Sequence, residues 1–438
     1  MTHKSPLASD IISDLPSNII ESILVHLPLR DAVKTSVLSR KWRYNWVTLP
    51  QLVFDNSFCT GPPQNQAMRK ELFMTIYQVL LLHNGPILKF TLSTPGLRSC
   101  PEINHLISFL SRNNIQDFTL CISRGECHKL SSFLFSCLQL RHLHLLSCLF
   151  KPPTTFNGFN RLVSLVFREV DIAVNIFKTI VPKCPLLKHL TLENCTNTEN
   201  LNIDAPNLKF LYFRGLFNSL RFKNTPVLAS VKFLASREEI PEYGEFRTAD
   251  MIKVFHCLPV IEDLFAGYSL LVFLAAGNIP DRLPATLEFL KTLVLSEICF
   301  GVLREASCAL CLIRSSPNLE KLKFKVNHSA TADEVKAVVE YMKAQDFSDM
   351  SLNKLREVKM LSFSGSKPEM EFVKLLLDKS PLLKTMHIHP KRGDTLTGFR
   401  ILKEVLNDAA HSTSSSPAML RFGLREFLGI VLVENSLT

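Results

Sequence analysis

The first 39 residues contain two short runs of apolar positions with helical spacing. After Ser17, a residue type that favours helix N-termini, apolar side chains recur at intervals of three and four residues as far as Leu27. Pro28 ends this run, because proline cannot continue a helix. Residues 30–39 then repeat the spacing over a shorter stretch. The pattern predicts two short helices separated at Pro28.

A third helix is predicted by Leu38, Trp42 and Trp46, which recur every four residues and place the chain's only two tryptophans on one stripe. Basic residues occupy the other faces of this stretch. About 35 residues in three short helices are too few to bury so much apolar surface by themselves. The surplus must be covered either by the rest of the chain or by another protein.

Beyond the segment SFCTGPPQNQ, whose glycine and two prolines indicate a boundary, a short motif recurs. It consists of one apolar residue, two variable residues, and then apolar, variable and apolar positions. Clear copies begin at Leu140, Leu162, Leu187 and Leu208, and weaker copies lie on both sides of them. The intervals between the middle apolar positions centre roughly on the mid-twenties, which is typical of leucine-rich repeats.

Each copy supplies one short strand and a return segment, and a single copy cannot bury its own apolar face. We therefore expect an α/β fold whose copies stack into a curved solenoid, with short parallel strands inside and helices and loops outside. Helical return segments are expected at 173–181, 304–314, 331–344 and 370–379. The copy at 261–266 is poor, so we expect a kink or a change of register there.

The residue order of the first segment resembles the F-box of plant proteins. The matching positions include Leu15-Pro16, Leu27-Pro28-Leu29 and Lys41-Trp42-Arg43. In that family three helices bind a Skp-type adaptor, which bridges to a cullin and a RING subunit. The resemblance implies that the apolar residues of the box bury against the adaptor: Leu15, Pro16, Ile20, Ile23, Leu24, Leu27, Pro28, Val33, Val37, Leu38 and Trp42. It implies that Trp46 instead packs the box against the segment that follows.

The later part of the chain is similar to plant F-box/FBD/LRR-repeat proteins. The stretches LEFLKTLVLSEICFG, LIRSSPNLEKLKF and LREVKMLSFSGSKPEMEFVKLLLDKSPLLKTMHI carry this resemblance. The expected divisions are a disordered N-terminus at 1–9, an F-box at 10–56, a linker and connecting helix at 57–85, leucine-rich repeats at 86–345, an FBD segment continuing the solenoid at 346–425, and a C-terminal tail at 426–438.

The family resemblance implies the substrate receptor of an SCF-type cullin-RING ubiquitin ligase, which binds the adaptor through the F-box and an unidentified protein substrate through the repeats. It implies a non-catalytic subunit, because the transfer chemistry belongs to the partners and this chain contributes proximity and specificity. An adaptor-binding scaffold that ubiquitinates no substrate would have the same sequence, so this alternative stays open.

The sequence contains no nucleotide-binding, serine-hydrolase or metalloprotease signature. Cys308 and Cys311 form one C-x-x-C without a second ligand pair nearby, whereas tetrahedral zinc needs four ligands. Two histidine pairs at i, i+2 have no carboxylate or thiol beside them. Cys148 and Cys195 occupy the repeat position where Asn or Cys ties down a turn. We expect neither a metal nor a cofactor.

Composition narrows the class of protein further. The chain is 46% hydrophobic, which suits a folded protein, and no apolar run approaches the roughly 20 residues of a membrane-spanning helix. The opening MTHKSPLASD lacks the charged-then-apolar order of a signal peptide. We therefore expect no membrane partner, free thiols, and a location in the cytoplasm, the nucleus or both. The net charge of +10 is spread along the chain and argues only weakly for nucleic acid.

Residues between the inward apolar positions of each strand are expected on the concave face of the solenoid. Those predicted there include Val166 and Val294 and the candidate substrate-binding residues His144, Thr191, Tyr212, Lys232, Lys323, Lys359 and His387. Lysines concentrate in the later copies, where their ordinary role is to keep a strand surface hydrated. The sharper hypothesis is a basic patch that receives an acidic or phosphorylated substrate segment. Binding of nucleic acid by the same lysines is a less favoured alternative.

Overall fold

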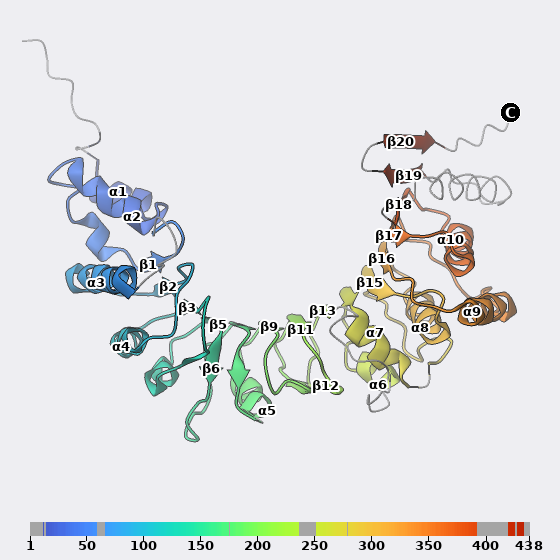
Figure 1. The fold of residues 1–438 in the computed structure, drawn as a ribbon, viewed down its shortest axis with the longest axis horizontal. Coiled ribbons are helices and arrows are strands. Elements are labelled where there is room, and N and C mark those ends of the chain that lie inside the picture. Colours follow the sequence, from blue (N-terminus) through green and yellow to red (C-terminus); the bar gives the residue numbers. More distant parts are fainter. Residues whose placement is uncertain are drawn as a thin grey trace, which may run out of the picture. The chain divides into compact units, whose positions relative to one another are not determined.

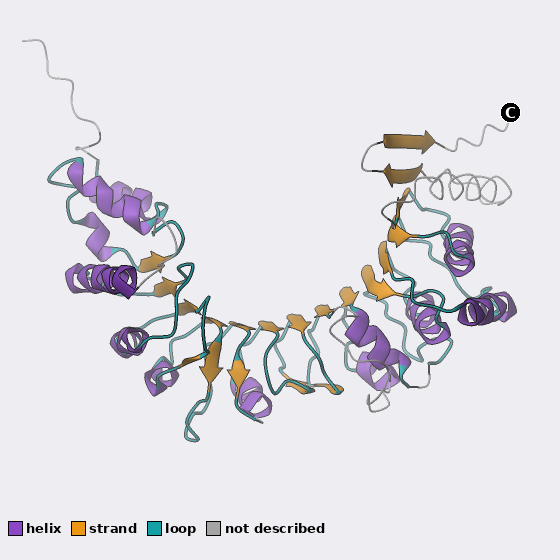
Figure 2. Ribbon diagram, in the orientation of Figure 1, coloured by secondary structure: helices purple, strands orange, loops and turns teal. Residues whose placement is uncertain are grey.

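The computed structural model describes residues 12, 15–58, 66–174, 176–235, 251–277, 279–391, 419–424 and 427–432. The chain divides into two compact units. Unit 1 comprises Met1–Leu187 with Cys195–Asn197, and unit 2 comprises Lys188–Asn194 with Thr198–Thr438. Within each unit parallel strands form a sheet, and helices and loops lie on one side of it (Figure 2).

Unit 1 begins with two short helices, α1 (Ser17–Val25) and α2 (Leu29–Lys34) (Figure 1). The predicted break at Pro28 is confirmed, since Pro28 is the N-cap of α2 in an extended conformation. The predicted N-cap of α1 is wrong by one residue. Pro16 occupies the cap position without a side-chain hydrogen bond, and Ser17 is already helical. Proline suits this place because its fixed φ and missing N–H are tolerated at a helix start.

The predicted third helix is also wrong. Residues 38–44 form turns, flanked by the short 3₁₀ helices η1 (Thr35–Val37) and η2 (Asn45–Thr48). The backbone bonds here span three residues, as from the Trp42 amide to the Ser39 carbonyl at 3.2 Å. Both indoles are nevertheless buried, so a continuous helix is not needed to bring these two side chains inside.

The sheet of unit 1 has the strand order β1-β2-β3-β5-β7, and neighbouring strands pair in parallel and in register. Its strands are β1 (Gln51–Phe54), β2 (Lys89–Leu92), β3 (Asp117–Cys121), β5 (His142–Leu146) and β7 (Ser164–Arg168). The return segments contain α3 (Gln66–Leu82), α4 (Pro101–Leu110), η3 (Ser132–Ser136), α5 (Ile176–Ile180) and η4 (Val181–Lys183). A second, smaller sheet is formed by β4 (His128–Lys129), β6 (Cys148–Phe150) and β8 (Asp171–Ile172).

The sheet of unit 2 continues the same arrangement and ends in one antiparallel pair. Its strands are β9 (His189–Glu193), β11 (Phe210–Arg214), β13 (Ser230–Leu234), β14 (Asp263–Ala266), β15 (Thr292–Ile298), β16 (Lys321–Val326), β17 (Glu357–Phe363), β18 (Thr385–Pro390), β19 (Met419–Leu424) and β20 (Phe427–Leu432). The return segments contain the paired strands β10 (Asn200–Asp204) and β12 (Ser219–Lys223) and the helices α6 (Met251–His256), α7 (Tyr268–Ala275), α8 (Leu303–Arg314), α9 (Ala332–Ala344) and α10 (Lys367–Lys379).

The core of each unit lies between the sheet and the return segments. Phenylalanines from successive copies meet there, as in unit 2, where Phe300 lies 5.2 Å from Phe324 and 4.3 Å from Phe372 between ring centroids. Each of these three side chains is less than 2% exposed. Full burial of such a side chain contributes about 1.5–3 kcal/mol, so contacts between copies, not within one copy, hold the stack together.

The turns after the strands explain two of the cysteines. Ser147, Glu169 and Asn194 follow β5, β7 and β9 with positive φ angles of 52°, 49° and 51°. Cys148 then donates to the Leu146 carbonyl at 3.4 Å, and Cys195 donates to the Phe167 carbonyl at 3.6 Å. Their predicted role as ties for the backbone at these turns is confirmed.

Two further expectations have clear outcomes. The four helical return segments are present as α5, α8, α9 and α10, with ends shifted by a few residues. The change of register expected at 261–266 is wrong, because β14 pairs in unbroken register with both β13 and β15. Leu264 supplies the inward anchor that aligns it, opposite Val231 and Leu293.

Candidate functional site

The first candidate surface lies on the helices that open unit 1. Of the eleven residues predicted to face an adaptor, Ile20 and Leu24 are fully buried and Trp42 is 3% exposed. The Trp42 indole also donates from Nε1 to the Ile12 carbonyl at 2.9 Å. These three side chains are therefore buried within this chain itself, and their contact with an adaptor stays a prediction.

The remaining eight predicted residues are accessible to different degrees. Leu15, Leu27 and Val33 are half-buried, whereas Pro16, Ile23, Pro28, Val37 and Leu38 are exposed. Val37 is 87% exposed and Leu38 is 50% exposed. We call these eight residues the helical surface. Exposed large apolar side chains of this kind are typical of a protein-binding surface.

Trp46 is also buried, at 6% exposure. It lies in η2, which packs against α1 and α2. The same turn is tied to the end of α3, because the Asn84 amide donates to the Val47 carbonyl at 2.8 Å and His83 Nε2 lies 2.9 Å from the Leu49 carbonyl. Trp46 thus packs beside the joint between the helical segment and the repeats.

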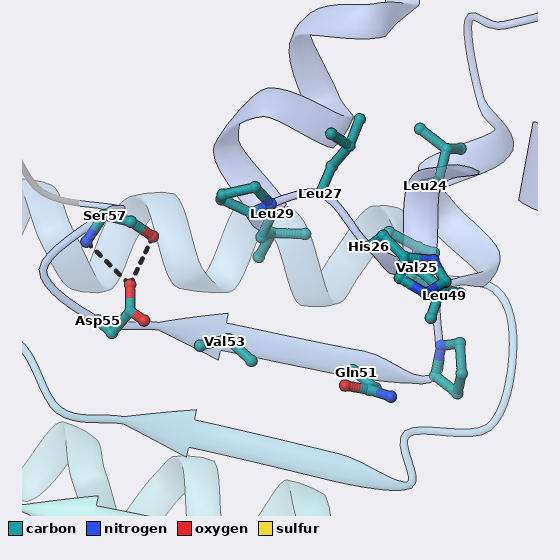
Figure 3. Close-up of a pocket in the computed structure, with 12 residues that line it drawn as sticks. Leu24, Val25, His26, Leu27, Leu29, Leu49, Gln51, Val53, Asp55 and Ser57 are labelled. Carbon is teal, nitrogen blue, oxygen red and sulfur yellow. Dashed lines mark hydrogen bonds between the residues drawn. The ribbon is translucent and has the colours of Figure 1, made fainter. Parts of the chain in front are cut away.

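A cleft of about 210 Å³ opens where the α1–α2 turn meets β1 (Figure 3). Its walls come from residues 24–29 on one side and 49–57 on the other, including the polar side chains of His26, Gln51 and Asp55. Asp55 is held by Ser57, whose amide and hydroxyl donate to it at 2.9 and 2.6 Å. The cleft is smaller than a typical small-molecule site and has room for one side chain of a partner.

The second candidate surface is the face of unit 2's sheet opposite its helices (Figure 2). Strand register places one residue per strand in a straight row across it. From β9 to β18 this central row is, in strand order, Thr191, Tyr212, Lys232, Phe265, Val294, Lys323, Lys359 and His387. All eight are half-buried, between inward neighbours that are buried.

The six predicted substrate-binding residues in unit 2 therefore share one face and one row. Thr191, Tyr212 and Lys232 are direct neighbours, and so are Lys323, Lys359 and His387. Phe265 lies between the two groups and was missed, because its copy of the motif is poor. His144 and Val166 pair with each other in unit 1 and belong to that unit's own sheet.

Several basic side chains on or beside this face of unit 2 have a partner. Lys232 Nζ lies 5.5 Å from the centroid of the Phe210 ring, and Arg214 lies 3.4 Å from Glu193. Lys291 pairs with Glu262 at 2.8 Å, and Lys325 pairs with Glu297. Lys323 and Lys359 are different: they lie opposite each other, and no carboxylate among the described residues forms an ion pair with either.

The histidines of unit 1 are less suited to a charged surface. Burial, and secondly the Arg168 charge, lower the pKa of His144. His142 lies 3.9 Å from Asp117. In the described part of the chain no group of three or more potential ligands is arranged to hold a metal ion.

A buried polar network in unit 1 was also missed, because its members lie 24 to 29 residues apart. Asn104 Oδ1 accepts from the Ser131 amide at 2.9 Å, so the His128 Nε2 beside it at 3.2 Å must be protonated and donate. His128 Nδ1 then accepts from the Ser99 hydroxyl at 2.9 Å. Burial lowers the pKa of His128, which keeps the ring neutral. Through its bonds to Ser99 and Asn104, the neutral ring helps to fix the loops before α4 and after β4 to each other.

The C-x-x-C pair lies inside α8. Cys308 and Cys311 are both fully buried, and burial raises the pKa of Cys311 to about 11. Burial raises the pKa of Cys308 further still. Both are protonated thiols that pack in the core, since the reactive form of cysteine is the thiolate.

No helix in the described ranges is long and apolar enough to cross a bilayer. Comparison with known proteins finds the F-box domain at residues 12–51 and the repeats of FBD-associated F-box protein At5g56370 at residues 103–324. F-box/FBD/LRR-repeat protein At1g13570 of Arabidopsis thaliana is 37% identical over 399 residues, which cover 91% of this chain and 95% of that protein. F-box/FBD/LRR-repeat protein At5g56420 of the same plant is 26% identical over 424 residues, or 93% and 97% of the two chains.

Proposed function

This chain belongs to the F-box/FBD/LRR-repeat protein family, and from that membership we propose that it is the substrate receptor of an SCF-type cullin-RING ubiquitin ligase. The observation that carries the proposal is the helical surface within the F-box match, where Val37 and Leu38 are exposed. A Skp-type adaptor covers this surface, and the adaptor leads to the cullin and RING subunits.

The adaptor's binding energy comes mainly from burying apolar side chains. Each large aliphatic residue that becomes fully buried contributes about 1.5–3 kcal/mol, less the free energy of immobilising two proteins. The α1–α2 turn, with Leu27 and Pro28, adjoins the cleft described above, which receives one adaptor side chain. Ile20, Leu24 and Trp42 contribute indirectly, because their buried side chains fix the positions of the helices that carry the surface.

The substrate binds the outward sheet face of the repeats. Side chains on parallel strands are rigid and regularly spaced, so they hold a protein segment in a fixed register. The receptor then raises the local concentration of substrate lysines near the ubiquitin-charged enzyme, and it performs no bond chemistry itself.

The first test replaces Val37 and Leu38 with Asp in the full chain, co-expressed with a plant Skp-type adaptor. Two carboxylates in an apolar interface should weaken the adaptor's affinity by roughly a hundredfold or more, because each removes a contact and must itself be desolvated. The readout is co-purification followed by calorimetry. Matched controls are Leu138→Asp and Leu186→Asp, which change apolar residues of unit 1 that are 55% and 46% exposed.

Equal loss of binding in the controls, or no binding of any adaptor to a folded wild-type chain, would contradict the proposal. The alternative function is an adaptor-binding scaffold without a substrate. A reconstituted ligase separates the two, since only a receptor supports transfer of ubiquitin to a protein captured by the repeats.

A further inference from the structure

We propose that the central row of unit 2 binds an acidic peptide segment, with Lys323 and Lys359 holding its carboxylate or phosphate group and Phe265 with Val294 holding its apolar residues. The proposal rests on the proposed function, because it names the substrate class that the receptor takes. The two lysines are hereafter called the cationic pair.

The cationic pair places two like charges side by side on neighbouring strands. Lys323 on β16 and Lys359 on β17 are register partners, so their backbones are about 4.8 Å apart. Like charges directly opposite each other destabilise a sheet. A sequence selected only for folding would place a carboxylate or a neutral residue at one of these positions, and an anion bound between the two ammonium groups relieves the repulsion.

Other lysines near the cationic pair differ from it in having carboxylates as neighbours. One row away, Lys321 lies opposite Glu357, and Lys325 pairs with Glu297. Lys291, at the start of the neighbouring copy, pairs with Glu262. Hydration of the sheet does not require an uncompensated pair, because Lys291 and Lys325 are charged and paired at once. The cationic pair stands out as the place where a counter-charge from outside fits.

Apolar residues lie next to the cationic pair in the same row. Val294 is the register partner of Lys323, and Phe265 is the next residue along the row. Both are half-buried and present apolar surface on the same face. On the other side, His387 is the register partner of Lys359. The row thus changes from apolar to basic over four strands.

The spacing predicts the form of the ligand. Phe265 lies two strands from Lys323 and three from Lys359, or about 10–14 Å at 4.8 Å per strand. An extended peptide that runs across the strands advances about 3.3 Å per residue. The acidic or phosphorylated residue should therefore lie roughly three to five residues from the apolar ones.

A peptide fits these observations better than a nucleic acid. Single-stranded nucleic acids need a positively charged path with repeated aromatic platforms. Here Phe265 and Val294 separate Lys232 from the cationic pair, so neither the charge nor the aromatic surface is continuous along the row. A short anionic group next to aliphatic contacts matches an acidic protein segment.

The experiment uses the full chain in complex with its adaptor and three degenerate twelve-residue peptide libraries. One library has a fixed phosphoserine, the second a fixed aspartate and the third a fixed serine. Bound peptides are sequenced by mass spectrometry, and selected ones are measured by fluorescence anisotropy. The test variant is Lys323→Gln with Lys359→Gln, and the matched control is Lys291→Gln with Lys325→Gln, which removes the same charge from paired lysines.

We expect an anionic library to bind roughly tenfold or more tightly than the serine library, as for charge-assisted hydrogen bonds, with apolar residues enriched three to five positions from the fixed residue. The test variant should lose this preference, and the control should change affinity less than about twofold. The first two libraries distinguish phosphate from carboxylate as the anion that the pair prefers.

The proposal is overturned if both double variants lose affinity equally, if the serine library binds as well as the anionic ones, or if single-stranded poly-uridylate binds more tightly than any peptide. Adaptor co-purification is measured on the same samples. Loss of the adaptor with intact peptide binding counts against the ligase function alone, whereas retained adaptor with no anion preference counts against the peptide site alone.

Discussion

At the scale of single residues, the two tryptophans show how the helical segment is built. Trp42 and Trp46 are both buried within unit 1, so the segment has a small core of its own. The surface left for a partner comes from shorter side chains such as Ile23, Val37 and Leu38. If the adaptor binds as proposed, internal packing and adaptor binding depend on different residues, and mutations should separate them.

Trp42→Ala should destabilise the helical segment by about 3–5 kcal/mol in the absence of any adaptor, because it leaves a cavity and removes the Nε1 bond to Ile12. Hydrogen exchange of the α1 amides measures this locally. Val37→Ala is the control: exchange should stay within about 0.5 kcal/mol of wild type, while adaptor affinity falls. Unchanged exchange in Trp42→Ala would place the indole outside the internal core.

A second residue-scale feature is the ion pair between His328 and Glu369 in unit 2. His328 Nδ1 lies 3.4 Å from Glu369, and its Nε2 lies 2.7 Å from the Ser362 carbonyl. The hydrogen bond to Glu369 is the main reason that the pKa of His328 is raised above 6.5. Burial would raise the pKa of Glu369, but hydrogen bonds from His328, Ser364 and Ser366 outweigh it and lower that pKa.

The sign of the pH dependence follows from these directions. A raised histidine pKa stabilises the fold fully below pH 6.5, and this stabilisation is lost as the pH rises through the folded-state pKa. His328→Gln should therefore increase hydrogen exchange at residues 362–369 more at pH 6 than at pH 9. His105→Gln, an exposed histidine of α4 in unit 1, serves as control. An effect of equal size at both pH values would contradict the ion pair.

At the scale of elements, the same strand-to-helix device occurs twice in unit 2, after β15 and after β17. β15 and β17 each contain a residue with positive φ near their ends, Glu297 at 66° and Ser362 at 58°. A buried glutamate in the first turn of the next helix then accepts a backbone amide, Cys299 to Glu305 and Ser364 to Glu369, both at 2.7 Å. The negative charge also suits a helix N-terminus. The device fixes the angle between each strand and its return helix.

The element-scale features differ in how well the sequence predicts them. The period of the motif predicts the strands and their inward faces, because burial of Leu and Phe at alternate positions leaves one solution for each strand. The third helix, the cap at Pro16 and the network around His128 are not predictable in the same way. They depend on tertiary contacts, such as the indole of Trp42 reaching Ile12, that no local pattern encodes.

The features of the candidate site also differ in how well the sequence predicts them. Register alone predicts which residues share the outward face, so six predicted residues fall in one row. What distinguishes Lys323 and Lys359 from Lys325 is the partner of each charge, which depends on the turn that directs Glu297 toward Lys325. That turn is formed by a single residue with positive φ and leaves no periodic signal.

At the scale of the whole molecule, stability is a sum of contacts between neighbouring copies. Phe324→Ala in the middle of unit 2 should remove about 3–5 kcal/mol, because Phe324 contacts Phe300 and Phe372 from adjacent return segments. Hydrogen exchange should increase in β15, β16 and β17 and remain unchanged in β2 and β3. A uniform increase over both units would show a single cooperative structure instead.

The exposed side chains of Val37 and Leu38 have a consequence for the amount of this protein in a cell. A ligand that binds only the folded form stabilises it by RT ln(1 + [L]/Kd), or about 2.7 kcal/mol at a hundred times Kd. If the chain is a receptor as proposed, its adaptor-free form lacks this increment and presents apolar side chains to chaperones and proteases. Its lifetime would then follow the supply of free adaptor, so that competing receptors set one another's abundance.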